Sequence, residues 1–173
     1  MRPQGHVIAS TGLGAIFWAR SRDWRTMLIS LVFGVLVDVD HFIDYWYSEG
    51  RVTFDLETFM GTRYFKKRGR IFVLFHAWEY LPLLYFLWQA WKGRKWAVAA
   101  TAAMSTHVVF DHFLNDLKPL GYFLWWRIKH RFNAAVIIDW DKADEIDARH
   151  EDYKQRLKRG EVSLRERLTS LFV

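Results

Sequence analysis

The 173-residue chain contains no cysteine. A disulfide framework, a thiolate zinc site and a cysteine nucleophile are therefore excluded, and any bound metal must use imidazole and carboxylate ligands. Such a mixture suits zinc, manganese or iron and does not choose among them. The sequence also lacks internal repeats and low-complexity segments. Its length allows one domain with a real core and leaves no room for two full domains with a linker.

Aromatic side chains are abundant instead. They make up 18% of the chain and include ten tryptophans, a residue that favours membrane interfaces, where one end of the ring stays wet. The net charge is +6, and much of the excess lies beside aromatic residues in the runs 20–25, 63–70, 92–95 and 127–131. Such patches fit anionic phospholipid head groups or nucleic-acid phosphates, or form a solvated rim around an apolar body. We expect an anionic lipid or membrane surface as the partner, and not nucleic acid.

Apolar stretches predict an all-α protein, a membrane-associated bundle of four to five helices. The predicted helices cover residues 5–19, 24–47, 71–91, 95–117 and 120–132. Pro82 should kink the third of these, because it removes one backbone hydrogen bond. Residues 1–135 would form the bundle domain. Residues 136–173 are mostly charged and predict an amphipathic helical arm that docks on a partner, such as a larger membrane complex, or on the domain.

Three of the predicted helices approach the ~20 residues that a bilayer crossing requires. Each also carries ionisable groups, which are costly inside a membrane unless they face a bundle interior. The connections 48–70 and 92–95 are both basic although they flank one predicted helix, against the tendency for positive charge to stay on one side. The sequence therefore predicts membrane association and leaves full crossing open. The first apolar run lacks a clear signal-peptide cleavage site, so we expect it to be retained.

Metal-ligand residues interrupt these apolar stretches in four places. Charged and imidazole groups avoid apolar helices unless something compensates them, so a shared polar site is the simplest interpretation. The four groups are His6; Asp38, Asp40, His41 and Asp44; His76 and Glu79; and His107, Asp111, His112 and Asp116.

Spacing supports shared ligation within these groups. His107 and Asp111 are four residues apart and share a helical face, whereas His112 lies about 100° further round. His76 and Glu79 are three apart, in the reverse order of the Glu-x-x-His pairs that build di-metal sites in helix bundles. A buried hydrogen-bonded pair is the alternative in both cases.

The run 38–44 holds three acids, which repel one another unless they are protonated or neutralised by a cation. Its alternative is a helix end that emerges into water. If the site holds a metal, Asp38 or Asp44 would orient a ligand or act as the base.

This pattern resembles the membrane-bound metal-dependent hydrolases, a family whose best-known bacterial member is LexA-regulated. The matching motifs are Gly5-His6, Asp38-Val39-Asp40-His41, His76 and His107-Val108-Val109-Phe110-Asp111. A more distant similarity is to the helical zinc-dependent phospholipases C. The chain departs from the family where a histidine is missing ahead of His76, and Glu79 could stand in for it.

The resemblance implies a bacterial inner-membrane hydrolase of a phosphoester or phospholipid that uses a divalent metal, with zinc expected first. The candidate ligands are His6, Asp40, His41, His76, Glu79, His107, Asp111 and His112. Asp38 and Asp44 are the candidate catalytic residues. Two other hypotheses stay open: a non-catalytic subunit of a membrane complex that keeps this fold and grips its partner through the arm, and an ion or proton carrier with buried acids as a relay.

Overall fold

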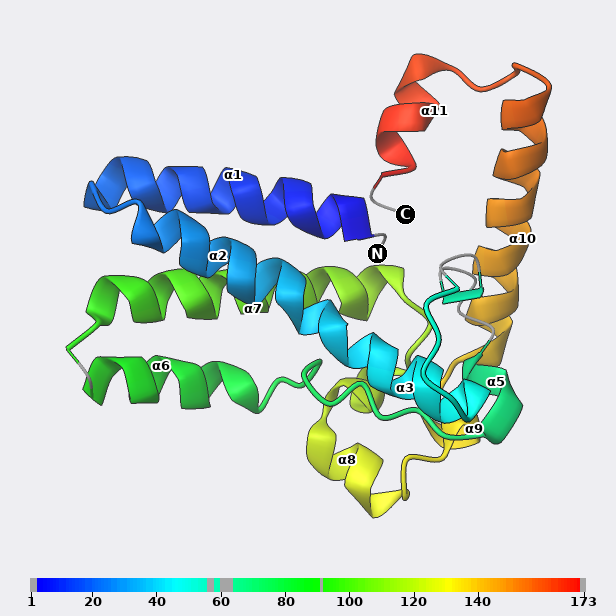
Figure 1. Ribbon diagram of the computed structural model, residues 1–173, viewed down its shortest axis with the longest axis horizontal. Coiled ribbons are helices and arrows are strands. Elements are labelled where there is room, and N and C mark those ends of the chain that lie inside the picture. Colours follow the sequence, from blue (N-terminus) through cyan, green and yellow to red (C-terminus); the bar gives the residue numbers. More distant parts are fainter. Residues whose placement is uncertain (1–2, 56–57, 60–63, 91, 172–173) are drawn as a thin grey trace.

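A computed structural model describes residues 3–55, 58–59, 64–90 and 92–171 (Figure 1). The described residues are helical, with two isolated β-bridges and no strand among them. The all-α prediction is confirmed, but these residues form more helices than the four to five expected. The elements are α1 (Pro3–Ser21), α2 (Arg25–Val35), the 3-10 helix η1 (Leu36–Val39), α3 (Asp40–Glu49), α5 (Phe65–Arg68), α6 (Tyr80–Ala90), α7 (Arg94–Leu114), the 3-10 helix η2 (Pro119–Tyr122), α8 (Leu124–Lys129), α9 (Ala134–Ile137), α10 (Trp140–Lys158) and α11 (Leu164–Thr169). Of the basic run 63–70, Arg63 lies outside the described residues.

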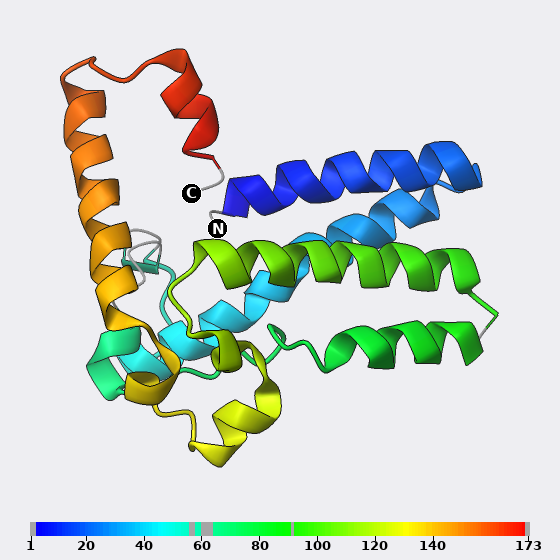
Figure 2. The same cartoon turned by 180° about the vertical axis from the view of Figure 1, so that it is seen from behind.

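Four helices form the elongated body of the molecule. α2 packs between α1 and α7, and α6 packs against α7. The α1–α2 and α6–α7 turns lie at one end of this body, on the left of Figure 1 and the right of Figure 2. Buried alanines on α7 allow this close packing, among them Ala97, Ala100 and Ala103. The N-terminus of α1 and the C-terminus of α7 therefore meet at the other end.

Gly34 marks a close approach of α2 to α1. A Cβ atom at this position would lie 2.0 Å from Ser10 Oγ and 3.6 Å from Ala103 Cβ. Any larger residue would push the helices apart, so glycine is required here for packing. The backbone carbonyl of the same residue also takes part in the site described below.

The predicted second helix is interrupted at the acidic run. α2 passes into η1 over Leu36–Val39 and then into α3, and such 3-10 stretches within helices often mark functional positions. Taken together, Arg25–Glu49 is long and apolar enough to cross a membrane, and it is the single helix of that kind in the described part of the chain. Core helices of soluble proteins and signal sequences share this length and composition. By length, α1 and α7 also approach a crossing, with 19 and 21 residues, but among the described residues Arg25–Glu49 alone is apolar enough as well.

The predicted helix over residues 71–91 is half wrong. Residues 71–79 form turns and irregular backbone, and α6 begins only at Tyr80. Pro82 consequently sits in the first turn of α6, where its missing N–H would have had no intrahelical partner. The predicted kink therefore has no cause. His76 and Glu79 also do not share a helical face, because neither lies in a helix.

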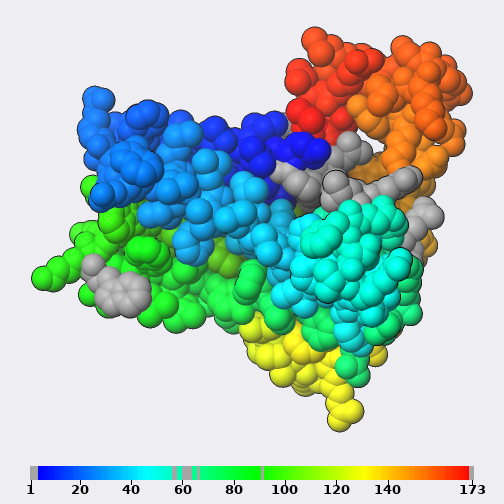
Figure 3. Space-filling view, viewed as in Figure 1, coloured from blue at the N-terminus to red at the C-terminus, as the bar shows by residue number. Residues whose placement is uncertain are grey.

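After α7, the chain first forms short helices that pack into the core and then two helices, α10 and α11, that stand off the body. The predicted helix over residues 120–132 is divided into η2 and α8 at Phe123, whose backbone is extended. Tyr122, Ile137 and Ile138 of this segment are buried in the core with Val73 and Val108. α10 and α11 then form the charged helical arm, which Figure 3 shows in orange and red standing off the body.

Candidate metal centre

Six of the predicted side chains converge from five segments at the end of the body where α1 begins and α7 ends. They are His6 of α1, Asp38 of η1, His41 of α3, His76 of the loop before α6, and His107 and Asp111 of α7. We call these six residues the His/Asp cluster. Four of its members are buried, whereas the side chains of Asp38 and His41 are each 24% exposed. The cluster therefore reaches the surface on the side of η1 and α3.

The first group of possible ligands within the cluster combines residues from the first and the last of the sequence motifs. Ligand atoms of His6, Asp38, His107 and Asp111 all lie within 4.8 Å of one another. His107 Nε2 lies 3.0 Å from Asp111 Oδ2 and 3.4 Å from Asp38 Oδ1. His6 Nε2 lies 3.0 Å from Asp111 Oδ1, and its ring stacks on His107 with 3.8 Å between centroids. Around a tetrahedral zinc, neighbouring ligand atoms are roughly 3.3 Å apart, which matches these separations.

A second group shares Asp38 with the first. It consists of Asp38, His41 and His76, again with ligand atoms within 4.8 Å of one another. His76 Nε2 lies 3.1 Å from Asp38 Oδ1, and His41 Nε2 lies 3.7 Å from the same oxygen. Asp38 is thus the member that connects the two groups.

The hydrogen bonds of the two central histidines fix where their lone pairs point. His76 Nδ1 lies 3.1 Å from Asp40 Oδ2, and His107 Nδ1 lies 2.9 Å from the carbonyl oxygen of Gly34. Both oxygens can only accept, so both Nδ1 atoms must donate. Each neutral imidazole then presents a bare Nε2 lone pair to the cluster. This arrangement, with the second nitrogen held by a carboxylate or carbonyl, is typical of metal-ligating histidines.

The two Nε2 atoms face one another at only 2.9 Å. Asp38 Oδ1 and Asp111 Oδ2 lie against the same atoms, at 3.1 Å and 3.4 Å from His76 Nε2. Acceptors packed this closely repel one another unless a cation or extra protons lie among them. The cluster could therefore hold a metal ion, and the residues present fit one.

Bound protons would play the same part when metal is absent. Burial alone would lower the pKa of His76, but the carboxylates of Asp40 and Asp38 outweigh it and raise that pKa to about 9. Burial is likewise outweighed at His107, where Asp111 and Asp38 raise the pKa to about 10. Burial opposes ionisation of Asp111, yet His107 and His6 hold its pKa well below the usual range. The cluster thus strongly favours positive charge at its centre.

Asp40 and Asp44 lie behind the cluster and hold its loop. Asp44 Oδ1 accepts the Phe72 N–H at 2.5 Å, and its Oδ2 accepts the Val73 N–H at 2.8 Å. Asp40 Oδ2 accepts the Phe75 N–H at 2.6 Å, in addition to His76 Nδ1. These carboxylates replace the helical hydrogen bonds that residues 71–79 would otherwise make. The predicted ligand Asp40 orients His76, and the predicted catalytic residue Asp44 positions the loop.

Arg127 holds the same loop from the other side, and the sequence analysis missed it. Its side chain is fully buried, although its run was interpreted as a basic surface patch. Its guanidinium donates to the carbonyl oxygens of Phe72 at 2.6 Å, of His76 at 2.8 Å, and of Val73. Val73 has a φ of +34°, which is strained for a β-branched residue and persists only when its surroundings enforce it. No sequence signal within the run distinguishes Arg127 from its exposed neighbours.

The predicted ligands Glu79 and His112 lie apart from the cluster. Glu79 Oε1 accepts the Trp125 N–H at 3.1 Å. The His112 ring contacts Trp78 and Tyr122. Among the described residues, neither side chain belongs to a group whose ligand atoms could share an ion. Glu79 therefore does not take the place of the missing family histidine in this geometry.

No family model, curated protein or solved structure matches this chain. The resemblance to membrane-bound metal-dependent hydrolases consequently stays a prediction. What the structure defines is an all-helical protein with a buried His/Asp cluster that could hold a metal ion.

Proposed function

We propose that the chain is a membrane-associated, metal-dependent hydrolase of a phosphoester. The observation that carries this proposal is the close approach of two histidine Nε2 atoms, 2.9 Å apart, among the carboxylates of Asp38 and Asp111. Because both Nδ1 atoms donate elsewhere, the two Nε2 atoms and the carboxylates beside them are acceptors, which suits a divalent cation. The absence of cysteine leaves nitrogen and oxygen donors, and zinc is the ion that we propose first.

Each residue has a distinct part in this proposal. His6, His107, Asp111 and Asp38 would hold one ion, and His41 and His76 would hold a second beside the shared Asp38 carboxylate. A divalent ion in this position supplies Lewis-acid polarisation of a phosphoryl oxygen and acidifies bound water. Asp38, which is partly exposed, is the carboxylate placed to meet substrate and accept a proton. Asp44 cannot easily do so, because both its oxygens accept backbone N–H groups of the loop.

The surroundings of the cluster support a substrate carried in a lipid layer. Asp38 and His41 form its exposed side, and the apolar residues Leu36, Val39 and Ile43 on the same segment are 56%, 51% and 42% exposed. Apolar side chains around an active-site opening favour an amphiphilic substrate over a freely soluble one. We therefore propose a phospholipid or another lipid-linked phosphoester.

The test combines metal content with turnover. The full chain is purified without added metal, and its zinc, manganese and iron are quantified. Hydrolysis of bis-p-nitrophenyl phosphate and of phosphatidylcholine in mixed micelles is measured on the same sample. We expect about one or more ions per chain and metal-dependent release of product. His107→Asn should abolish both, whereas His112→Asn, a change at a nearby histidine outside the cluster, should leave the metal content unchanged. A wild-type protein that stays metal-free in excess zinc would contradict the proposal.

A non-catalytic subunit is the second candidate, and one observation favours it. Glu79 does not join the cluster, so the missing family histidine has no replacement there. This candidate shares the metal prediction but not the turnover. Metal bound at full occupancy with no hydrolysis of either substrate would favour it over the hydrolase.

A further inference from the structure

Positive charge collects at the end of the body opposite the His/Asp cluster. The α1–α2 and α6–α7 turns meet there (Figures 1 and 2). Residues 20–25 and 92–95 hold one acid, Asp23, and six bases: Arg20, Arg22, Arg25, Lys92, Arg94 and Lys95. We call this region the basic end. Cations dominate its field, so it attracts anions.

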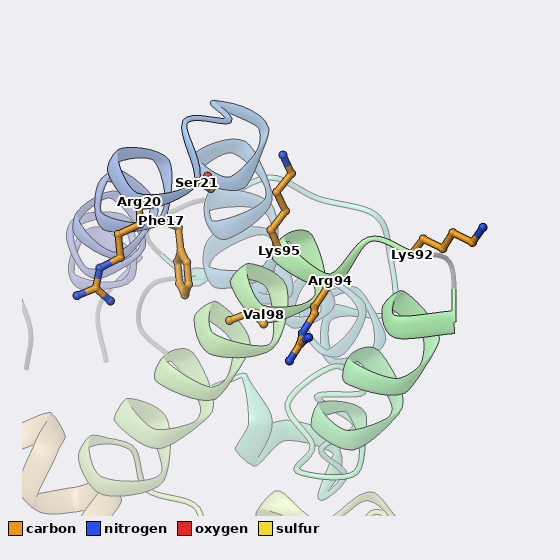
Figure 4. Close-up of a pocket in the computed structure, with 7 residues that line it drawn as sticks. All are labelled: Phe17, Arg20, Ser21, Lys92, Arg94, Lys95 and Val98. Atoms are coloured by element: carbon orange, nitrogen blue, oxygen red, sulfur yellow. The ribbon is translucent and has the colours of Figure 1, made fainter.

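A groove of about 570 Å³ opens at the basic end between α1 and α7. Figure 4 shows the Phe17 ring reaching from α1 into the space above Val98 of α7, with Arg20 and Arg94 on opposite sides of them. Ser21, Lys92 and Lys95 complete the lining. The groove therefore combines an apolar floor with a cationic rim, which is the pattern of an amphiphilic anion.

The single acid of the basic end is engaged within the protein. Asp23 Oδ2 lies 2.7 Å from Lys95 Nζ and accepts the Trp96 indole N–H at 3.0 Å. Asp23 Oδ1 accepts the Arg25 N–H at 3.1 Å. Because Asp23 pairs with Lys95, the charges of Arg20 and Arg94 are not offset by an acid in residues 20–25 or 92–95.

Tryptophans surround the same end. Trp18 and Trp24 are 48% and 60% exposed, and Trp88 and Trp96 pack against each other at the start of α7. Exposed tryptophan beside arginine and lysine is characteristic of the headgroup layer of a membrane. The position of the groove therefore matches a lipid better than a soluble phosphate compound.

We propose that this groove binds one anionic phospholipid. Its phosphate lies between Arg20 and Arg94, and the first part of an acyl chain lies along Phe17 and Val98. Arginine suits this role because its planar guanidinium bonds phosphate oxygens in pairs. The site rests on the membrane association of the proposed function and not on its metal chemistry. It would fix how the bundle meets the lipid surface while the His/Asp cluster acts at the other end.

The test measures retention of lipid by the purified full chain. Detergent-solubilised protein is incubated with phosphatidylglycerol or with phosphatidylcholine, and bound lipid is counted by native mass spectrometry. We expect phosphatidylglycerol to be retained preferentially. Each arginine removed should cost about fivefold in affinity, as for basic residues at anionic membranes, so the double variant Arg20→Gln/Arg94→Gln should lose about 25-fold. The matched control Arg159→Gln/Arg165→Gln removes the same charge from the exposed arm and should retain wild-type binding.

Two further measurements distinguish binding of a phospholipid from binding of a soluble phosphate compound. Phe17→Ser keeps the charge and should weaken phosphatidylglycerol retention, whereas glycerol 1-phosphate, which has the headgroup chemistry without acyl chains, should not displace the lipid. Displacement by glycerol 1-phosphate would overturn the lipid assignment in favour of a soluble phosphate ligand. Equal losses in the two double variants, or no loss in the Arg20/Arg94 variant, would overturn the site. Metal content measured on the same samples should not change, so failure here is distinguishable from failure of the metal centre.

Discussion

The two ends of the helical body are built in opposite ways. The cluster end is buried, rich in acceptors and held by contacts between residues far apart in the sequence, such as His6 with Asp111 and Arg127 with the 71–79 loop. The basic end is exposed, cationic and held largely by short turns and the Asp23–Lys95 ion pair. This difference implies that the cluster end depends on the whole fold, whereas the basic end tolerates change. Chemistry that needs exact placement belongs at the first end, and attraction of an anionic surface at the second.

Replacing the buried guanidinium of Arg127 at the cluster end should have the largest effect on stability. Arg127→Lys leaves buried carbonyl oxygens of Phe72, Val73 and His76 without donors, because an ammonium cannot serve all three from one position. We expect a loss of roughly 3–5 kcal/mol in the free energy of unfolding, measured by denaturant titration. Arg165→Lys, the same change at an exposed arginine of the arm, is the control and should be neutral. Equal, small effects of the two changes would refute the clamp assigned to Arg127.

Stability of the metal-free protein should fall as pH rises. The folded-state pKa values of His76 and His107 are raised to about 9 and about 10, above the ordinary value near 6.5. Their protonation therefore stabilises the fold fully below pH 6.5, and this contribution is lost as pH rises through 9 and 10. At 1.36 kcal/mol per pKa unit, the raised pKa of His76 alone accounts for about 3 kcal/mol of this loss. Thermal melts of chelated and zinc-loaded protein between pH 6 and 10 check this. A chelated protein as stable at pH 10 as at pH 6.5 would contradict the acceptor-only pocket.

The orientation of His76 should affect metal affinity more than stability. Asp40→Asn removes the carboxylate that accepts from His76 Nδ1, and loss of such partners weakens metal binding about 10- to 100-fold. Competition with a fluorescent zinc chelator measures this. Asp116→Asn, a change at another acid near the end of α7, should keep wild-type affinity. An Asp40→Asn protein that binds zinc as tightly as the wild type would remove Asp40 from the site.

The smallest effect is expected at the basic end. Asp23→Asn weakens the ion pair with Lys95, but exposed pairs contribute little because water screens them. Zinc content should stay the same, and the melting temperature should change only slightly. Loss of zinc from this variant would show that the two ends are coupled, against the comparison drawn above.

Much of the site could be predicted from the sequence because its residues are conspicuous where they stand. His6, His76 and His107 interrupt apolar stretches, and a helical spacing of four correctly places His107 and Asp111 together. The same reasoning could not separate ligand from support. Asp38 and Asp40 lie two residues apart in the same motif. The 3-10 turn of η1 nevertheless brings Asp38 into the cluster and leaves Asp40 behind His76.

The errors arose where distant side chains replace local hydrogen bonds. Residues 71–79 have the composition of an apolar helix, but Asp40, Asp44 and Arg127 satisfy their backbone groups and hold them in turns. Such a competition is invisible to periodicity, which registers only neighbours within a few residues. The position of Glu79 outside the cluster and the burial of Arg127 both depend on this loop, and so neither could be predicted from the sequence.

An anomalous difference map at the zinc absorption edge, from crystals of protein loaded with zinc, tests the central claim most directly. We expect a peak about 2.0–2.2 Å from the ligand atoms of His107 and Asp111, with Asp38 and His6 completing the coordination. A peak elsewhere on the protein, or none in zinc-loaded crystals, would contradict it.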